Sequence, residues 1–314
     1  MKFLILGAGG IGSYYGAKLL NQSHHITFIA RGEHLQAIKN NGLSLKHPEF
    51  SFHKKVDACS LEEIKNIDIS KIDAIFITTK STTTEQIAKD LSKIFTDKET
   101  MPYFVSLQNG VENEDILCKY FDEKKVIGAL TRKIGAHIIK PGYIEVTGVV
   151  ETILGPIIKT EENEIFVNKL TLTLNNAKIY SEYTNNIKLE LWKKLIINNG
   201  VNAICALLQI KTGVLMNNKK LNKIVYGLMQ ETANAAKFLD INISKKDVDI
   251  MYELIKNFDS IKPSMLVDRE FERAIELEEI SGVVIKYNEK QNQDSPYTRT
   301  ISTLLEFIYK NELK

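Results

Sequence analysis

The feature that most constrains the fold of this chain is a glycine-rich run near its start, Gly7-Ala8-Gly9-Gly10-Ile11-Gly12. It directly follows a short apolar segment, residues 3–6, and it begins a helical pattern. In that context the GxGxxG spacing is typical of a dinucleotide-binding turn: the first glycine permits the turn, the second lets a pyrophosphate approach, and the third lets helix and strand pack closely. The helix N-terminus adds N–H donors. We therefore expect these six residues to bind a dinucleotide. A turn without a ligand is the alternative, but it has no need for three entropically costly glycines.

The end of the second predicted strand indicates which dinucleotide binds. It carries Arg31, nineteen residues beyond Gly12, where an NAD site would place an Asp or Glu for the ribose 2′-hydroxyl. A guanidinium can instead form bidentate bonds with a 2′-phosphate. Only five of the 41 basic residues are Arg, which makes this position more informative. We therefore expect the cofactor to be NADPH/NADP+. The alternatives are that Arg31 is a solvated loop residue or that Glu33 binds a ribose of the cofactor.

The first half of the chain alternates strand-like and helical patterns. Helical spacing occurs at residues 11–21 and 83–95, and nearly wholly apolar runs occur at residues 3–6, 26–30, 74–79, 103–107 and 126–130. Apolar runs of this kind are typical of strands buried on both faces, so the pattern predicts a doubly wound, Rossmann-type parallel sheet. Between residues 142 and 182 the strand-like segments are shorter and are separated by turns. We expect residues 143–146 and 152–154 to be antiparallel edge strands.

The second half of the chain is predicted to be helical. After the capping cluster Thr184-Asn185-Asn186, helical spacing continues nearly to the end, near residues 187–208, 218–238, 246–257 and 265–290. The fold class is therefore α/β with two domains: residues 1–185 form an NADP-binding Rossmann-type domain, and residues 186–314 form an all-helical substrate and catalytic domain. A length of 314 residues suits two cores.

Charge and cysteine content narrow the function classes. Lys and Arg total 41 against 39 Asp and Glu, a net charge of +2, so no global field favours nucleic acid or a membrane surface. The cysteines, Cys59, Cys118 and Cys205, are scattered without metal-ligand spacing, so we expect structural thiols and no metal. The apolar opening segment is too short for a signal peptide or a membrane span. We expect a soluble cytoplasmic protein, and a homodimer is compatible with the sequence.

Two polar residues follow predicted strands at the sheet edge where open α/β sheets bind ligands. Lys80 follows the third strand and Asn109 follows the fourth. We expect Lys80 near the phosphates or adenosine ribose of the cofactor, and Asn109 near its nicotinamide. Each could instead be an ordinary polar residue that ends a strand.

An apolar helical segment later in the chain carries a polar stripe. Lys194, Asn198 and Asn202 recur every four residues and span roughly 12 Å, about the length of a small carboxylic acid with the reacting end of a nicotinamide. A solvated face would favour Lys and Glu over Asn, which has weak helix propensity, although we expect the adjacent Lys193 to be solvated. A lysine here can donate a proton to a ketone oxygen as hydride arrives. Its carboxylate partner should lie in the acidic helix after Arg273, where periodicity does not choose among Glu276, Glu278 and Glu279.

Taken together, these residues resemble the 2-dehydropantoate 2-reductase (ketopantoate reductase) family. The resemblance runs in order from Gly7 to about Gly282, and its most specific parts are Glu-Leu-Trp-Lys-Lys-Leu at residues 190–195 and Pro-Ser-Met-Leu at residues 263–266. The other matching positions are Thr79-Lys80, Gln108-Asn109-Gly110, Asn198, Asn202, Asp268 and Glu276.

The resemblance implies reduction of ketopantoate, a 2-oxoacid, to pantoate by NADPH, in the pathway to pantothenate and coenzyme A. It implies Lys194 as proton donor and Glu276 as its catalytic partner and a ligand of the cofactor ribose. It further implies that Asn109 bridges cofactor and substrate, and that Arg31 and Lys80 hold the adenosine phosphate. The implied substrate ligands are Asn109, Lys194, Asn198, Asn202 and Ser264.

Three positions depart from the family pattern and bear on substrate identity. Ile275 and Cys205 stand where the family often has Thr, and Thr212 stands where it has a substrate-contacting Asn. A related dehydrogenase of another 2-oxoacid or of a 3-hydroxyacid therefore stays open. A non-catalytic NADP(H) sensor is disfavoured, since a sensor needs neither Lys194 nor Glu276.

Overall fold

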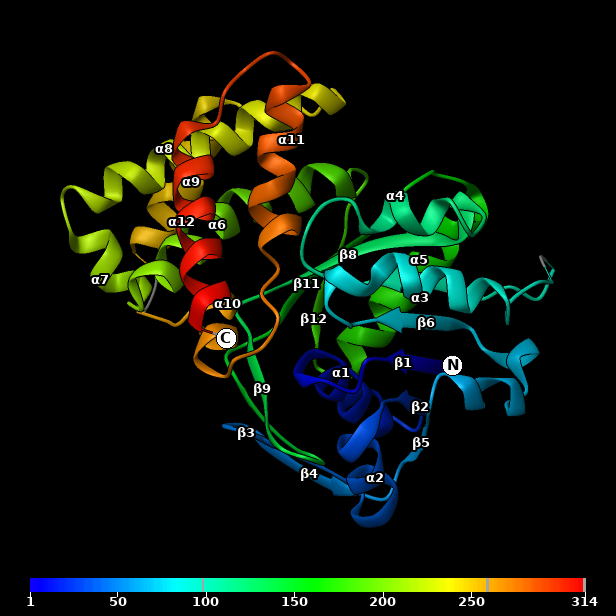
Figure 1. Ribbon diagram of the computed structural model, residues 1–314. Helices are drawn as coiled ribbons and strands as arrows, with labels where there is room; N and C mark the ends of the chain where they lie inside the picture. Colours follow the sequence, from blue (N-terminus) through cyan, green and yellow to red (C-terminus); the bar gives the residue numbers. More distant parts are fainter. Residues whose placement is uncertain (98, 258–259, 313–314) are drawn as a thin grey trace. The chain divides into compact units, whose positions relative to one another are not determined.

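The structure is a computed structural model that describes residues 1–97, 99–257 and 260–312 (Figure 1). The chain forms two compact units. Unit 1 comprises Met1–Gln108 and Glu112–Ile187, and unit 2 comprises Asn109–Val111 and Lys188–Lys314.

The main sheet of unit 1 is the expected doubly wound sheet. Its eight strands lie in the order β12-β11-β8-β7-β6-β1-β2-β5, and the six from β8 to β5 are mutually parallel. Every residue of β6 and β7 is buried, which explains why these runs are almost wholly apolar. The strands are β1 Lys2–Leu6, β2 His25–Ile29, β5 Asp57–Cys59, β6 Ala74–Ile77, β7 Tyr103–Ser106, β8 Val126–Arg132, β11 Glu151–Pro156 and β12 Tyr180–Tyr183.

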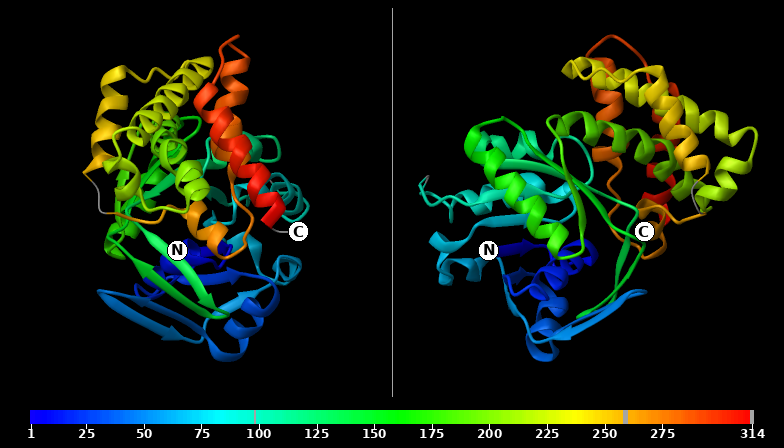
Figure 2. Two further views of the ribbon diagram at one scale, coloured as in Figure 1. Left: turned by 60° about the vertical axis from the view of Figure 1, so that its left-hand side comes forward. Right: turned by 180° about the vertical axis from the view of Figure 1, so that it is seen from behind.

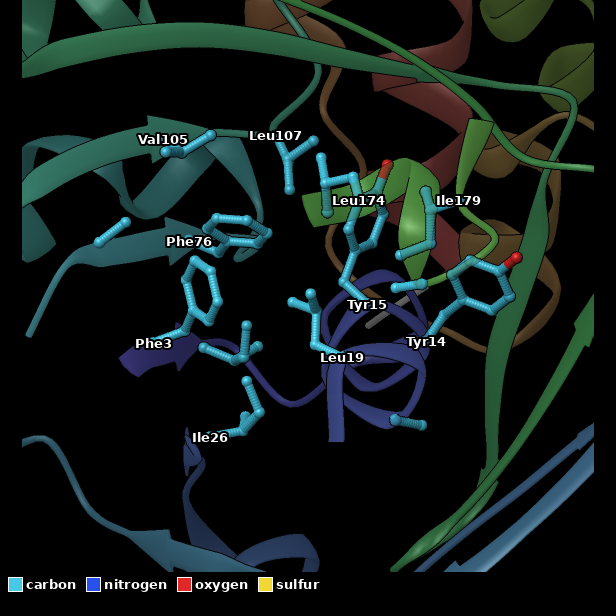
Figure 3. Close-up of a cluster of buried hydrophobic side chains, with 14 of the residues drawn as sticks. Phe3, Tyr14, Tyr15, Leu19, Ile26, Phe76, Val105, Leu107, Leu174 and Ile179 are labelled. Atoms are coloured by element: carbon cyan, nitrogen blue, oxygen red, sulfur yellow. The ribbon is translucent and has the colours of Figure 1, made fainter. Parts of the chain in front are cut away.

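Successive residues of each strand supply two separate cores. Phe3 and Ile5 belong to one hydrophobic cluster and Leu4 and Leu6 to another, because side chains alternate between the faces of a sheet. The first cluster includes residues of α1 and α5, and the second includes residues of α3 and α4. Figure 3 shows the first, in which Phe3 and Phe76 pack edge to face with ring centroids 5.2 Å apart. The helices of unit 1 are α1 Gly10–Leu20, α2 Gly32–Asn41, α3 Thr84–Ser92, α4 Asn113–Cys118 and α5 Glu161–Asn176.

The segment between residues 135 and 182 differs from expectation. Residues 143–146 were predicted to be an antiparallel edge strand. They form β10, which is antiparallel to β9, but the edge position is wrong, because β10 lies inside a second sheet ordered β4-β3-β10-β9 beside α1 (Figures 1 and 2). β11 is antiparallel to β8 as expected. It is not an edge strand, because its other side pairs with β12. Residues 161–176 form a helix. The second sheet comprises β3 Leu43–His47, β4 Phe50–Lys54, β9 Gly135–Lys140 and β10 Tyr143–Thr147.

Unit 2 is helical, and the helix expected near residues 187–208 is confirmed as α6, Ile187–Leu208. The expected helix over 265–290 is wrong, because it is broken after α10. Glu272 adopts a left-handed φ of 53°, and the Arg273 N–H donates to the Asp268 carbonyl, 2.8 Å away, as in a Schellman helix end. The chain resumes with a π-helical turn, Glu278–Gly282. The other helices are α7 Thr212–Asn217, α8 Leu221–Ala236, α9 Lys245–Lys256, α10 Ser264–Glu270, α11 Val283–Glu289 and α12 Pro296–Glu312.

Candidate active site

The glycine turn of unit 1 has the shape that a bound pyrophosphate requires. Gly7 has φ +101°, and a Cβ there would lie 2.9 Å from the Thr79 side chain. A Cβ on Gly12 would lie 2.2 Å from the Gly7 carbonyl oxygen. A Cβ on Gly9, in contrast, would meet no atom within 4 Å. Packing therefore demands Gly7 and Gly12, whereas at Gly9 the missing side chain leaves open space beside the start of α1. A dinucleotide phosphate fits this arrangement.

Arg31 and Lys80 lie at the same edge of the sheet as the glycine turn. Arg31 is exposed and directly precedes α2, two residues after β2 ends. Lys80 is half-buried and follows β6. Because β2 and β6 flank β1 in parallel, the carboxyl ends of all three strands meet at this edge. The fold of unit 1 thus gathers the residues expected to bind the cofactor phosphates.

Gln108, at the end of the next strand, was not assigned a role from the sequence alone. It is 3% exposed, and its Nε2 donates to Thr84 Oγ1, 2.8 Å away, and to the Thr79 carbonyl oxygen, 3.2 Å away. Its Oε1 is buried and has no hydrogen-bond partner within the described residues. This side chain ties the loops after β6 and β7 together.

In unit 2, α6 carries the expected polar stripe. Lys194 and Asn198 are half-buried, and Asn202 is only 3% exposed. Lys193 was expected to be solvated, but it is half-buried, and its Nζ forms an ion pair with Glu190, 3.3 Å away. The stripe is therefore partly enclosed.

Glu276 is the buried member of the three candidate carboxylates. It is 4% exposed, whereas Glu279 is half-buried and Glu278 is exposed. Asn109 belongs to unit 2, and its Nδ2 donates to Glu276 Oε2, 3.1 Å away. The expectation that Glu276 lies within a helix is wrong, since it lies in the irregular stretch between the Schellman turn and the π-helical turn. π-Helical turns often occur at functional sites, so this interruption fits a functional carboxylate.

Ser264 is the remaining predicted substrate ligand, and Thr212 stands where the family has a substrate-contacting Asn. Ser264 is exposed and is the first residue of α10. Thr212 is 1% exposed, and its Oγ1 accepts a hydrogen bond from the Ile261 N–H, 3.0 Å away. The Thr212 hydroxyl is therefore engaged with the backbone of Ile261, three residues before Ser264.

Sequence reasoning also missed Asn199, which follows the stripe residue Asn198. It is fully buried, and its Nδ2 donates to Thr232 Oγ1 and Thr298 Oγ1 at 3.0 and 3.1 Å. Its Oδ1 accepts from Ser281 Oγ at 2.9 Å, within the π-helical turn that follows Glu276. An Asn inside an apolar helix was the available signal, because a buried amide needs partners.

The three cysteines are free thiols. In the part of the chain that the structure describes, no helix is both long and apolar enough to cross a membrane.

Comparison with known proteins extends over both units. Residues 3–159 match the family model "Ketopantoate reductase PanE/ApbA", and residues 186–309 match its C-terminal counterpart. The chain is 31% identical to a 2-dehydropantoate 2-reductase of Pyrococcus horikoshii, over 94% of this chain and 93% of that protein. It is 30% identical to the enzyme of the same name from Archaeoglobus fulgidus, over 96% and 95%.

Solved structures agree with this relationship. The 2-dehydropantoate 2-reductase of Geobacter metallireducens superposes with a TM-score of 0.88 at 27% identity, covering 98% of this chain and all of that one. A D-mandelate dehydrogenase, solved with NADH and anilino(oxo)acetate, superposes with a TM-score of 0.90 at 24% identity, over 100% and 99%. At that identity the second likeness concerns the fold alone. With both of its parts matched and its relatives covered nearly end to end, the chain belongs to the ketopantoate reductase family of oxidoreductases.

Proposed function

We propose that this protein reduces 2-dehydropantoate to pantoate with NADPH, as a cytoplasmic enzyme on the route to pantothenate and coenzyme A. The family membership supports a reductase of a small 2-oxoacid. The observation that carries the proposal furthest is the buried Glu276 carboxylate with the Asn109 amide on it, in the unit that also bears the polar stripe of α6. Burying a carboxylate costs free energy unless it has partners. Because a purely structural position could hold an apolar residue without that cost, the burial of Glu276 favours a catalytic role.

The residues divide the work as follows. NADPH, when bound, would supply a hydride for the carbonyl carbon. Lys194 donates a proton from its ammonium group to the carbonyl oxygen, so the product is a secondary alcohol, and its positive charge stabilises the developing alkoxide. Glu276 orients Lys194 and binds the cofactor ribose, and Asn109 holds Glu276. Neutral amides at Asn198 and Asn202, with the Ser264 hydroxyl, bind the polar groups of the substrate.

In unit 1 the glycine turn would hold the pyrophosphate, and Arg31 and Lys80 the adenosine phosphate. Both cations lie at the edge where the turn begins, and the absence of any atom within 4 Å of a Cβ on Gly9 supports a close approach of the backbone to a phosphate. The guanidinium supports NADPH over NADH.

A second candidate is a dehydrogenase of another 2-oxoacid. It is favoured by Thr212, whose hydroxyl is engaged with the Ile261 backbone where the family has a substrate-contacting Asn. Fewer polar groups of the protein would then contact the substrate near Thr212.

One assay tests both. The rate of NADPH oxidation, followed by absorbance, is compared for ketopantoate, pyruvate, 2-oxoisovalerate and phenylglyoxylate. We expect the highest kcat/KM for ketopantoate. A higher value for another 2-oxoacid would favour the second candidate, and NADPH binding with no turnover of any of them would favour a sensor.

A further inference from the structure

His34 connects the dinucleotide-binding turn to a different part of unit 1. Its Nε2 lies 2.7 Å from the Ala8 carbonyl oxygen, inside the glycine turn, and the Gly142 N–H donates to its Nδ1, 3.1 Å away. A backbone N–H can only donate, so Nδ1 is the acceptor, and the neutral ring carries its proton on Nε2. His34 Nε2–H therefore donates to the Ala8 carbonyl. Burial lowers the pKa of His34, which favours this neutral form.

The far end of this bridge is itself held in place. Gly142 has φ +77° in the turn between β9 and β10, and its carbonyl accepts a hydrogen bond from the Ser44 N–H, 2.9 Å away. A Cβ on Gly142 would lie 3.2 Å from the Ala37 Cβ, so the turn is also packed against α2. The partner of His34 is thus a backbone group of the second sheet, and that group is held by contacts of its own.

The near end controls one peptide group of the glycine turn. The Ala8 carbonyl has a second donor, Ser13 Oγ, 2.9 Å away and buried. The Ala8 carbonyl and the Gly9 N–H belong to one planar trans peptide, so they point in opposite directions. Two donors on the carbonyl therefore fix the direction of the Gly9 N–H, at the residue where the turn is open.

We propose that His34 is a positioning residue for the cofactor: it holds the Ala8–Gly9 peptide so that the Gly9 N–H faces the dinucleotide pyrophosphate. The proposal rests on the proposed function, since it requires a dinucleotide at this turn. Ser13 acts on the same carbonyl from inside α1, so the two side chains share the task.

The test is the affinity of the full-length protein for NADPH, measured by fluorescence titration. His34→Leu removes both hydrogen bonds and should raise the Kd about tenfold or more, the loss typical of one hydrogen bond to a charged group. His34→Gln should restore most of the affinity, because its amide can donate to Ala8 and accept from Gly142 at once. Ser13→Ala should weaken binding in the same direction. In turnover assays the change should appear in the KM for NADPH and not in the KM for the 2-oxoacid.

His53→Leu is the matched control, since His53 is an exposed histidine of β4 whose Nδ1 lies 2.8 Å from Ser44 Oγ. A folded His34→Leu variant with the wild-type Kd would overturn the proposal. If His34→Leu does not fold, His34→Phe keeps an aromatic ring and removes both hydrogen bonds, and a wild-type Kd for that variant would overturn the proposal as well. A wild-type protein that binds NADPH but reduces no 2-oxoacid would contradict the proposed reaction only, and the His34 comparison would still decide this inference. Absence of NADPH binding would contradict both.

Discussion

Two adjacent lysines on α6 offer a test of the chemistry at the scale of single residues. Lys194 lies in the polar stripe, whereas Lys193 is about 100° away on the helix and pairs with Glu190. General acid catalysis typically contributes about 10²- to 10⁴-fold, so Lys194→Ala should lower kcat by at least that order with little change in NADPH affinity. Lys193→Ala should keep most of its turnover. The measurements are steady-state rates and NADPH titrations, and an inactive Lys193→Ala beside an active Lys194→Ala would remove the proton-donor assignment.

The role proposed for Arg31 in cofactor choice can be tested at the same scale. It is exposed after the end of β2, where its guanidinium can meet a 2′-phosphate. Arg31→Ala should weaken NADPH binding by about tenfold or more and leave NADH binding nearly unchanged. Titration of both cofactors against both proteins measures this. Equal affinity of the wild-type protein for NADPH and NADH would contradict it.

At the scale of elements, the glycines of the first β–α turn should separate folding from binding. Gly12→Ala places a Cβ 2.2 Å from the Gly7 carbonyl oxygen, between α1 and β1, so it should lower the Tm. Gly9→Ala places its Cβ in open space, so the Tm should hold while NADPH affinity falls, because the methyl group occupies the path of the pyrophosphate. Thermal unfolding and NADPH titration of both variants check this pair. A Gly9→Ala variant with wild-type affinity would exclude the turn as the phosphate site.

One buried amide connects α6 to three neighbouring segments. Asn199 Nδ2 and Oδ1 bond to hydroxyls from α8, α12 and the π-helical turn. Asn199→Leu leaves these buried hydroxyls without the amide, at a cost of about 1–3 kcal/mol for each group that finds no new partner. We expect a clearly lower Tm. Asn198→Ala is the comparison, since Asn198 is only half-buried: it should keep its Tm and raise the KM for the substrate. Similar Tm values for the two variants would show that the buried network contributes little.

At the scale of the whole molecule, two half-buried histidines predict how stability depends on pH. Burial lowers the pKa of both His24 and His34. Each ring also accepts a hydrogen bond at Nδ1, from the N-terminal ammonium at 3.2 Å and from Gly142 at 3.1 Å. Below the unfolded pKa of about 6.5 the unfolded chain takes up protons that the folded chain resists, so unfolding is favoured as the pH falls.

The Tm should therefore be highest above pH ~7 and fall between pH ~6.5 and ~5. Carboxylates titrate mostly below this window, which isolates the histidines. His34→Gln should flatten part of the decline, because a glutamine does not titrate. A Tm that stays level or rises on acidification in the wild-type protein would contradict the assignment of neutral histidines.

The sequence by itself determined the features that depend on near neighbours along the chain. The glycine turn, the alternation of buried strands with α1 and α3, and the long helix α6 follow from periodicity and from the steric demands of Gly7 and Gly12. The order of polar residues along α6 could be read for the same reason. The choice of Glu276 among three acids needed the family resemblance, since spacing alone is blind to burial.

Only the tertiary structure decided what depends on distant partners. β10 pairs with β3, about one hundred residues earlier, and nothing in either strand specifies the other. Glu272 has the left-handed backbone conformation that glycine usually adopts at a helix end. Because no glycine stands there, the end of α10 could not be predicted from the sequence. The bonds of His34 to Ala8 and Gly142, and of Asn199 to three other elements, join groups far apart in the chain. Local propensity fixes each element, but a buried polar group gains its partner only when the whole unit has packed.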